Sequence, residues 1–298
     1  MDTKSQWIDY LPRALREEGV LRSGDDLEEI RLRVGRPMEL LYDKKSQVGV
    51  VPVTEEMITE LLNYLSDYSL YRLGASLKRG YITIPGGHRI GVVGHMNEKG
   101  EIYQFGGVNI RLAGRKVSGV STLAQLLVGK KQCHHTFIVA PPGVGKTTLL
   151  RNLIRELSGT KKVVVVDERG EIGGSYHGIP QIDLGPRTDV LDNCKKPFGI
   201  EMVLRSMSPE VIAVDELGNK EDFEAIHRAM QCGVMILGTI HGSSWEEFLQ
   251  KPYFEELQRD GMIQRVIFLK KRESGEREYA LYDDKQELLQ CGYLESVW

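Results

Sequence analysis

Apolar and polar residues follow different patterns in the two halves of this chain. Apolar and basic residues alternate over 30–34, and an apolar run covers 38–42, so both segments are predicted strands. From residue 54 to about 68, apolar residues recur at helical spacing, which predicts a helix. Two apolar runs within 81–93 flank a proline and two glycines, which predicts a β-hairpin. We therefore expect a small α+β domain over residues 1–115.

Further along, short apolar runs of strand length alternate with helical stretches. The predicted strands are 136–140, 163–167, 211–215 and 234–240. The predicted helices are 118–131, 145–157 and 221–230, and a β-hairpin is predicted over 264–281. Apolar strands separated by helices indicate a mostly parallel sheet that is covered on both faces. The second predicted domain, residues 116–298, is therefore of the α/β class.

A glycine-rich loop joins the first of these strands to the next helix. Residues 140–148 read Ala-Pro-Pro-Gly-Val-Gly-Lys-Thr-Thr, close to the phosphate-binding motif G-x-x-x-x-G-K-[ST], in the strand–loop–helix context that the motif requires. Ala140 replaces the opening glycine, which we expect to be tolerated unless the position needs a positive φ. Lys146 would meet the β- and γ-phosphates, and the Thr147 hydroxyl would bind Mg²⁺. The predicted nucleotide-binding residues are Pro142, Gly143, Val144, Gly145, Lys146, Thr147 and Thr148.

The apolar strand over 211–214 ends in two acidic residues, Asp215 and Glu216. Downstream of a phosphate loop, carboxylates at a strand end serve magnesium-dependent phosphoryl transfer. We expect Asp215 to hold the metal through its water shell and Glu216 to take a proton from the attacking water. The sequence thus predicts a Mg²⁺-dependent hydrolase of ATP. It contains no visible motif that would read the base, so a preference for ATP over GTP stays open.

Two other strand ends carry polar residues at the edge where open α/β sheets bind ligands. Asp167 and Glu168 follow the strand 163–166, and one of these carboxylates would position water or magnesium near the γ-phosphate. The pleat of the strand decides which one faces the site, so both stay open, with a solvated strand end as the alternative. His241 follows the strand 234–240 and would sense the γ-phosphate, with a core-edge histidine as its alternative.

Composition limits the classes of function. Lys plus Arg number 39 against 42 Asp plus Glu, a net charge of −3, which does not favour binding to nucleic acid through bulk charge. The four cysteines are widely spaced without a C-x-x-C pair, so neither a zinc site nor a disulfide framework is expected. No signal peptide and no apolar run of membrane-spanning length is visible. We expect a soluble, cytoplasmic protein whose contact with membranes is made through partners.

The order of these motifs resembles the secretion ATPase superfamily, the hexameric motors of type II and type IV secretion and of pilus machines. The segments that correspond to its four sequence boxes are 140–148, 167–171, 211–216 and 238–241. The segments 29–37 and 78–91 are similar to the small domain of that group. The resemblance implies a RecA-like P-loop NTPase core and a hexamer with nucleotide sites between subunits.

Within that superfamily, the segments 167–174 and 205–216 closely resemble a sporulation branch from endospore-forming bacteria. This resemblance implies a mother-cell ATPase, peripheral to the membrane, that powers or assembles a secretion-like channel complex. It also implies that arginines of the small domain or of a neighbouring subunit reach the γ-phosphate, although an exposed arginine is usually only a solvated charge. The candidates are Arg79, Arg89, Arg111, Arg187 and Arg205, of which Arg205 is taken as a catalytic residue.

Two other functions remain open at the level of sequence. A nucleic-acid translocase could use basic pairs at 130–131, 161–162 and 270–272, against which the acidic charge balance argues. A scaffold could bind ATP without useful turnover. Loss of hydrolysis with retained ATP binding in Glu216→Gln would separate the motor from the scaffold.

Overall fold

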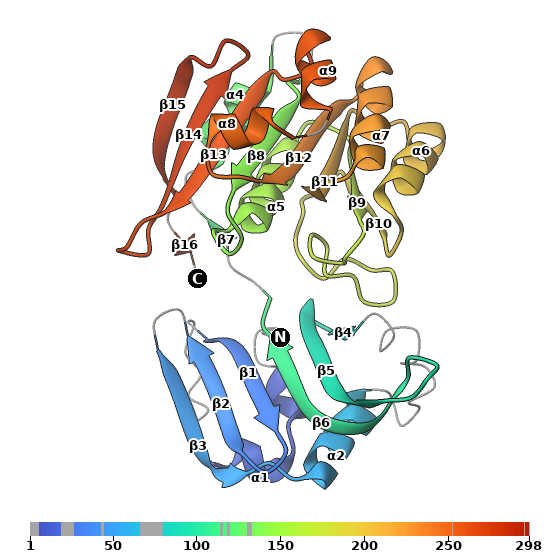
Figure 1. Ribbon diagram of the computed structural model, residues 1–298, viewed down its shortest axis with the longest axis vertical. Coiled ribbons are helices and arrows are strands. Elements are labelled where there is room, and N and C mark those ends of the chain that lie inside the picture. The colour runs from blue at the N-terminus through green and yellow to red at the C-terminus, as the bar shows by residue number, and fades with distance from the viewer. Residues whose placement is uncertain are drawn as a thin grey trace. The chain divides into compact units, whose positions relative to one another are not determined.

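The chain folds into two compact units. The computed structural model describes residues 6–18, 27–42, 45–65, 80–113, 116–117, 120–129, 133–251, 253–294 and 296–297. One unit contains Met1–Gly114 and Gly174–Ile182, and the other contains Arg115–Gly173 and Asp183–Trp298 (Figure 1). The segment Gly174–Ile182, which the sequence assigned to the second domain, thus groups with the first unit.

The first unit is built on a six-stranded sheet with the order β3-β2-β1-β6-β5-β4, in which all neighbours are antiparallel. Its strands are β1 (Leu27–Arg33), β2 (Pro37–Tyr42), β3 (Ser46–Pro52), β4 (Tyr81–Ile84), β5 (His88–Met96) and β6 (Ile102–Arg111). Its described helices are η1 (Gln6–Tyr10), α1 (Arg13–Arg16) and α2 (Glu55–Leu65).

The core of the first unit follows from alternation in the strands and helical spacing in α2. Ile30 and Leu32 of β1 point to the same face and pack in one buried cluster with Ile58 and Leu61 of α2. Thr54 begins this helix, because its hydroxyl accepts a hydrogen bond from Met57 N at 3.3 Å. The predicted strands and hairpin of this half are confirmed, and so is the predicted helix as far as residue 65. Its predicted end near residue 68 and Arg79 lie outside the described residues.

The second unit contains an eight-stranded sheet with the order β10-β9-β11-β12-β8-β13-β14-β15. Neighbours from β10 to β13 are parallel, and β14 and β15 are added antiparallel. The strands are β8 (Thr136–Ala140), β9 (Val163–Asp167), β10 (Thr188–Asp192), β11 (Val211–Leu217), β12 (Met235–His241), β13 (Arg265–Lys271), β14 (Arg277–Asp283) and β15 (Leu288–Leu294). The helices are α4 (Val120–Leu127), α5 (Lys146–Leu157), α6 (Lys196–Ser206), α7 (Lys220–Gln231), α8 (Trp245–Leu249) and α9 (Phe254–Arg259), and β7 (Lys116–Val117) pairs with β16 (Ser296–Val297).

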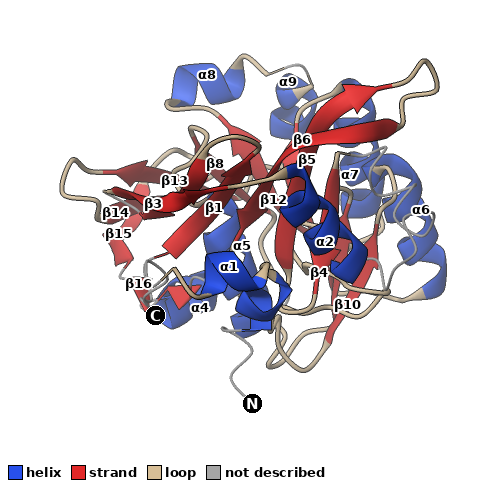
Figure 2. Cartoon of the chain, turned by 90° about the horizontal axis from the view of Figure 1, so that it is seen from below, coloured by secondary structure: helices blue, strands red, loops and turns tan. Residues whose placement is uncertain are grey.

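Burial explains the apolar runs of the central parallel strands. Every residue of β8 and of β9 is buried, as expected for strands covered on both faces. Alternate residues along β8, β9 and β11, for example Phe137, Val164 and Ile212, pack in one cluster with residues of α6, α7, α8 and α9. Helix α5 contacts β8, β11 and β12, and α6 and α7 lie side by side (Figure 2). The predicted RecA-like α/β core with a mostly parallel sheet is confirmed.

The strand order places the candidate site. Strand β12 lies between β8, which precedes the phosphate loop, and β11, which ends in the acidic pair. His241, at the end of β12, is in register with Ala140, at the end of β8. Because the carboxyl ends of parallel strands meet at one edge of a sheet, His241 falls between the phosphate loop and Glu216.

Candidate functional site

The phosphate loop lies between β8 and α5 and depends on two glycines. Gly143 and Gly145 have φ angles of +75° and +111°, a region that favours glycine. Helix α5 begins directly after Gly145, so its N-terminal N–H groups and dipole face the loop. Ala140 ends β8 without a positive φ, so its methyl group is tolerated as expected. The loop therefore has the backbone that phosphate binding requires.

An arginine from a distant hairpin supports this loop from outside. Arg277, the first residue of β14, donates from Nε to Val144 O at 2.9 Å. The same nitrogen would lie 2.8 Å from a Cβ placed on Gly145, so the position also needs glycine for space. The sequence did not indicate this contact, because the two residues are joined only by the folding of β13 and β14 beside β8.

Lys146 is held in the centre of the site. Its side chain is only 6 % exposed, and Nζ donates to Ala140 O at 2.8 Å and to Pro141 O at 2.9 Å. Burial lowers the pKa of Lys146, and the nearby charges of Asp215 and Glu216 oppose that shift. The two carbonyls thus fix Lys146 Nζ at the position where the motif places the phosphates.

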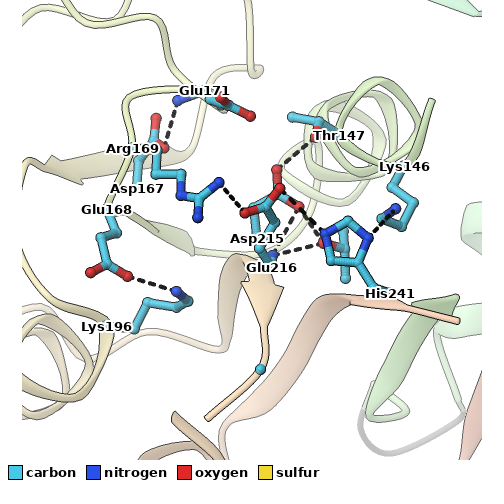
Figure 3. Close-up of polar contacts among 12 residues, drawn as sticks. Lys146, Thr147, Asp167, Glu168, Arg169, Glu171, Lys196, Asp215, Glu216 and His241 are labelled. Atoms are coloured by element: carbon cyan, nitrogen blue, oxygen red, sulfur yellow. Dashed lines mark hydrogen bonds and ion pairs between the residues drawn. The ribbon is translucent and has the colours of Figure 1, made fainter. Parts of the chain in front are cut away.

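His241 joins Lys146 to Glu216. The distance from Lys146 Nζ to His241 Nδ1 is 3.1 Å, and since an ammonium only donates, Nδ1 accepts. The other ring nitrogen, Nε2, then carries the hydrogen and lies 3.5 Å from Glu216 Oε1. Figure 3 shows the imidazole between the two side chains. The structure thus brings His241 into the predicted site, and its role as a γ-phosphate sensor stays a prediction.

Oxygen atoms of three residues form a cluster beside the loop. Thr147 Oγ1 donates to Asp215 Oδ2 at 2.6 Å, so the two predicted magnesium-binding residues are in contact. Thr239, fully buried in β12, donates from its hydroxyl to the other carboxylate oxygen, Oδ1. The donor set fits Mg²⁺, which takes few protein oxygens and keeps several waters. Sequence reasoning missed Thr239, although a polar residue in the apolar strand before His241 was a signal.

Glu216 occupies an unusual backbone conformation. Its φ is +52°, and the register between β11 and β12 shifts between Val214 and Leu217. Glu216 N donates to Thr239 Oγ1 at 2.8 Å and to Asp215 Oδ1 at 3.1 Å, which holds this bulge in place. The bulge lets two successive residues both serve the site, although an ordinary pleat would point them to opposite faces.

The sequence left open which carboxylate at the end of β9, Asp167 or Glu168, faces the site. Asp167 is 2 % exposed and accepts hydrogen bonds from the backbone N–H groups of Glu171, Ile172 and Gly173 at 2.8, 2.9 and 2.9 Å. Burial raises its pKa to about 6, against the opposing effect of these N–H groups. Asp167 therefore shapes the loop that follows β9.

Glu168 turns toward another charge. Its carboxylate accepts a hydrogen bond from Lys196 Nζ at 2.6 Å (Figure 3). The same ammonium lies 3.5 Å from the buried Asp222. The next residue, Arg169, contacts the acidic pair of β11: its guanidinium forms an ion pair with Glu216 Oε2. Catalytic participation of Glu168 stays a prediction.

The arginines expected from the sequence lie in other surroundings. Arg205 lies in the last turn of α6 with 78 % of its side chain exposed and pairs with Glu201. Arg187 donates to the carbonyls of Ser158 and Gly159. In the first unit, Arg89 stacks over the ring of Tyr81, with 3.8 Å from Cζ to the ring centroid, and Arg111 is exposed at the end of β6. Their predicted contact with the γ-phosphate stays a prediction.

The strand order, the phosphate loop and the acidic pair define a P-loop protein with a RecA-like core. The comparisons with known proteins then give the particular family: the chain belongs to the family described as sporulation stage III, protein AA, whose model matches residues 5–289. It is 38 % identical over 268 residues to the stage III sporulation protein AA of Bacillus subtilis (strain 168), covering 87 % of each chain. It is also 29 % identical over 258 residues to protein SEEDLING PLASTID DEVELOPMENT 1 of Arabidopsis thaliana, of which it spans 35 %.

Solved structures with the same fold include an ATPase and a pilus retraction motor. The ATPase DotB of Legionella pneumophila aligns with a TM-score of 0.58 and 18 % identity, covering 87 % of this chain and 78 % of that chain. The pilus retraction motor PilT with bound ADP aligns with a TM-score of 0.61 and 16 % identity, covering 86 % and 78 %. Within the described part of the chain, no helix combines the length and apolar character needed to cross a membrane.

Proposed function

We propose that this chain is a Mg²⁺-dependent ATP hydrolase that powers or assembles a secretion-like channel complex during endospore formation. The observation that carries the chemistry is the meeting of Lys146, Thr147, Asp215 and Glu216 at one edge of the sheet. The sporulation name of the family supports the biological setting. The shared fold with the ATPase DotB and the pilus retraction motor PilT supports mechanical work.

The geometry supports a simple division of roles among the residues. Backbone N–H groups of the loop and Lys146 Nζ would bind the phosphates, and Thr147 and Asp215 would hold Mg²⁺. Mg²⁺ held there would neutralise negative charge on the phosphates. Glu216 would take a proton from water as the water oxygen bonds to the γ-phosphorus and the bond to the β–γ bridging oxygen breaks. The products are ADP and inorganic phosphate.

We also propose the quaternary setting and the cellular setting that go with such a motor. The chain would assemble into a hexamer with nucleotide sites between subunits, each subunit made of a small domain over 1–115 and an ATPase domain over 116–298. It would act in the mother cell, attached to the membrane through partner proteins of the channel. The family and the solved structures of motor ATPases support these proposals.

Glu216→Gln tests the hydrolase directly. The amide keeps the shape of the side chain and removes the base, so we expect ATP turnover to fall by about 100-fold or more while nucleotide affinity is kept. Glu224→Gln is the matched control, because Glu224 is an exposed carboxylate of α7 that pairs with Lys220. Wild-type protein without magnesium-dependent turnover, at concentrations where it self-associates, would refute the proposal.

A scaffold that binds ATP without useful turnover gives a different result in cells. If Glu216→Gln supports sporulation as well as the wild type does, hydrolysis is not the required activity. A motor requires that this variant block sporulation while its protein level and partner binding stay normal.

A further inference from the structure

Arg169 holds a position in the site that neither the motifs nor the family resemblance indicated. Its guanidinium pairs with Oε2 of Glu216, and His241 Nε2 lies 3.5 Å from the other oxygen, Oε1. Both oxygens of the predicted base are thus engaged by protein groups (Figure 3). A carboxylate that takes a proton from water needs an oxygen facing that water.

The loop that carries Arg169 is anchored on both sides. Asp167 accepts three backbone N–H groups of the segment 171–173, and it is buried at the end of β9. Arg151 of α5 donates from Nε to Glu171 O at 3.1 Å. Since α5 also carries Lys146 and Thr147, the base of the loop is tied to the helix that binds the phosphates. The side chain of Arg169 itself is 62 % exposed, so it can change partner while its backbone stays in place.

A series of contacts links Arg169 to Lys146, the predicted γ-phosphate-binding lysine. Arg169 forms an ion pair with Glu216, and Glu216 Oε1 lies 3.5 Å from His241 Nε2. The other ring nitrogen of His241, Nδ1, lies 3.1 Å from Lys146 Nζ. A γ-phosphate bound at Lys146 brings negative charge next to Glu216, where two anions repel each other. The planar guanidinium, with paired N–H donors, matches phosphate oxygens as well as it matches a carboxylate.

We propose that Arg169 is a γ-phosphate-binding residue acting within its own chain, which exchanges Glu216 for the γ-phosphate when ATP binds. The exchange frees Glu216 Oε2 to accept the proton of the attacking water. It also places a second cation beside Lys146, where negative charge develops as the bond to the β–γ bridging oxygen breaks. ADP lacks the γ-phosphate, so the guanidinium returns to Glu216 after phosphate leaves. This assignment rests on the proposed hydrolase function and names the residue that distinguishes ATP from ADP.

The test compares the affinities of full-length protein for AMP-PNP, a non-hydrolysable ATP analogue, and for ADP, both with Mg²⁺. In Arg169→Ala we expect the affinity for AMP-PNP to fall by about tenfold or more, while the affinity for ADP changes less than about twofold. Turnover of ATP should fall by about 100-fold, as for other groups that stabilise transition-state charge. Arg169→Lys keeps the positive charge but lacks the paired N–H donors of the guanidinium, so it should recover part of the AMP-PNP affinity.

Arg259→Ala is the matched control, since Arg259 is an exposed arginine of α9 that lies near the carboxylate of Asp260. Equal losses of AMP-PNP and ADP affinity in Arg169→Ala would show a structural role and overturn the assignment. Faster turnover with an unchanged AMP-PNP to ADP ratio would also overturn it, because it would make Arg169 only an inhibitory partner of Glu216. If the wild type binds AMP-PNP but does not hydrolyse ATP, the hydrolase proposal fails, while the affinity ratio still decides the role of Arg169.

Discussion

Replacing Thr239 by valine removes one hydroxyl from the centre of the site and keeps the shape of the side chain. That hydroxyl donates to Asp215 Oδ1 and accepts from Glu216 N at 2.8 Å, and the residue is fully buried. Water therefore cannot easily replace it in Thr239→Val. The change should loosen both the predicted magnesium ligand and the predicted base without touching either side chain.

The size of the effect follows from the two lost hydrogen bonds. A bond to a charged group is worth about 1.5–3 kcal/mol and a neutral one about 1 kcal/mol, which gives about 2.5–4 kcal/mol in total. Glu216 N keeps its second acceptor, Asp215 Oδ1 at 3.1 Å, so the lower part of this range is expected. Part of the loss reduces the free energy of unfolding, and each 1.4 kcal/mol expressed in the transition state lowers kcat about tenfold.

Urea denaturation measures the loss in the free energy of unfolding, and steady-state ATP hydrolysis measures the loss in kcat. Thr239→Ser is the control, because it keeps the hydroxyl and loses one methyl group, worth about 0.8 kcal/mol. We expect the serine variant to retain most of the wild-type kcat and the valine variant to lose about tenfold. A valine variant as stable and as active as the serine variant would show that the hydroxyl does not order Asp215 and Glu216.

Two further predictions concern the groups around the loops. The pKa of Asp167, raised to about 6 from 3.8, means that its contribution to the free energy of unfolding is fully present below about pH 3.8 and is lost as pH rises through 6. Relative to Asp167→Asn, the wild type should therefore lose about 1 kcal/mol of unfolding free energy between pH 5 and pH 7 in urea titrations, and a gain would contradict the burial argument. Arg277→Ala removes the donor to Val144 O, so ADP affinity should fall about fivefold with little change in folding stability; unchanged affinity by calorimetry would exclude a role for this contact.

The parts of the fold that the sequence predicted well are those in which burial leaves a regular pattern. The strands β8 and β9 were predicted with their observed bounds, because both are covered on two faces and each contains a continuous apolar run. Strand β10 was not predicted. It is a partly buried edge strand that includes Asp189 and Asp192, so it carries no apolar run. Helix α6 was also missed, because Pro197 and Gly199 near its start weaken the helical pattern.

The candidate site was predictable where a motif fixes the chemistry and not where contacts depend on three-dimensional register. Lys146 and Thr147 follow from the phosphate-loop motif alone. The contact of Thr239 with Glu216 depends on a bulge in β11, and nothing in the alternation of residues indicates that bulge. The pairing of Arg169 depends on the turn that Asp167 organises, so two adjacent charged residues, Glu168 and Arg169, point to different partners.

The grouping of Gly174–Ile182 with the first unit affects how the molecule can be divided. Gly86 N donates to Gln181 Oε1 at 3.2 Å, and a Cβ placed on Gly87 would lie 3.3 Å from Ile182 Cγ1. A fragment that ends at residue 114 would therefore lack a segment that packs on its own hairpin. Swapping the small domain between relatives by a single crossover would pair this hairpin with a foreign segment. Exchange of the first unit therefore requires that two segments be replaced together, residues 1–114 before the phosphate loop and residues 174–182 after it.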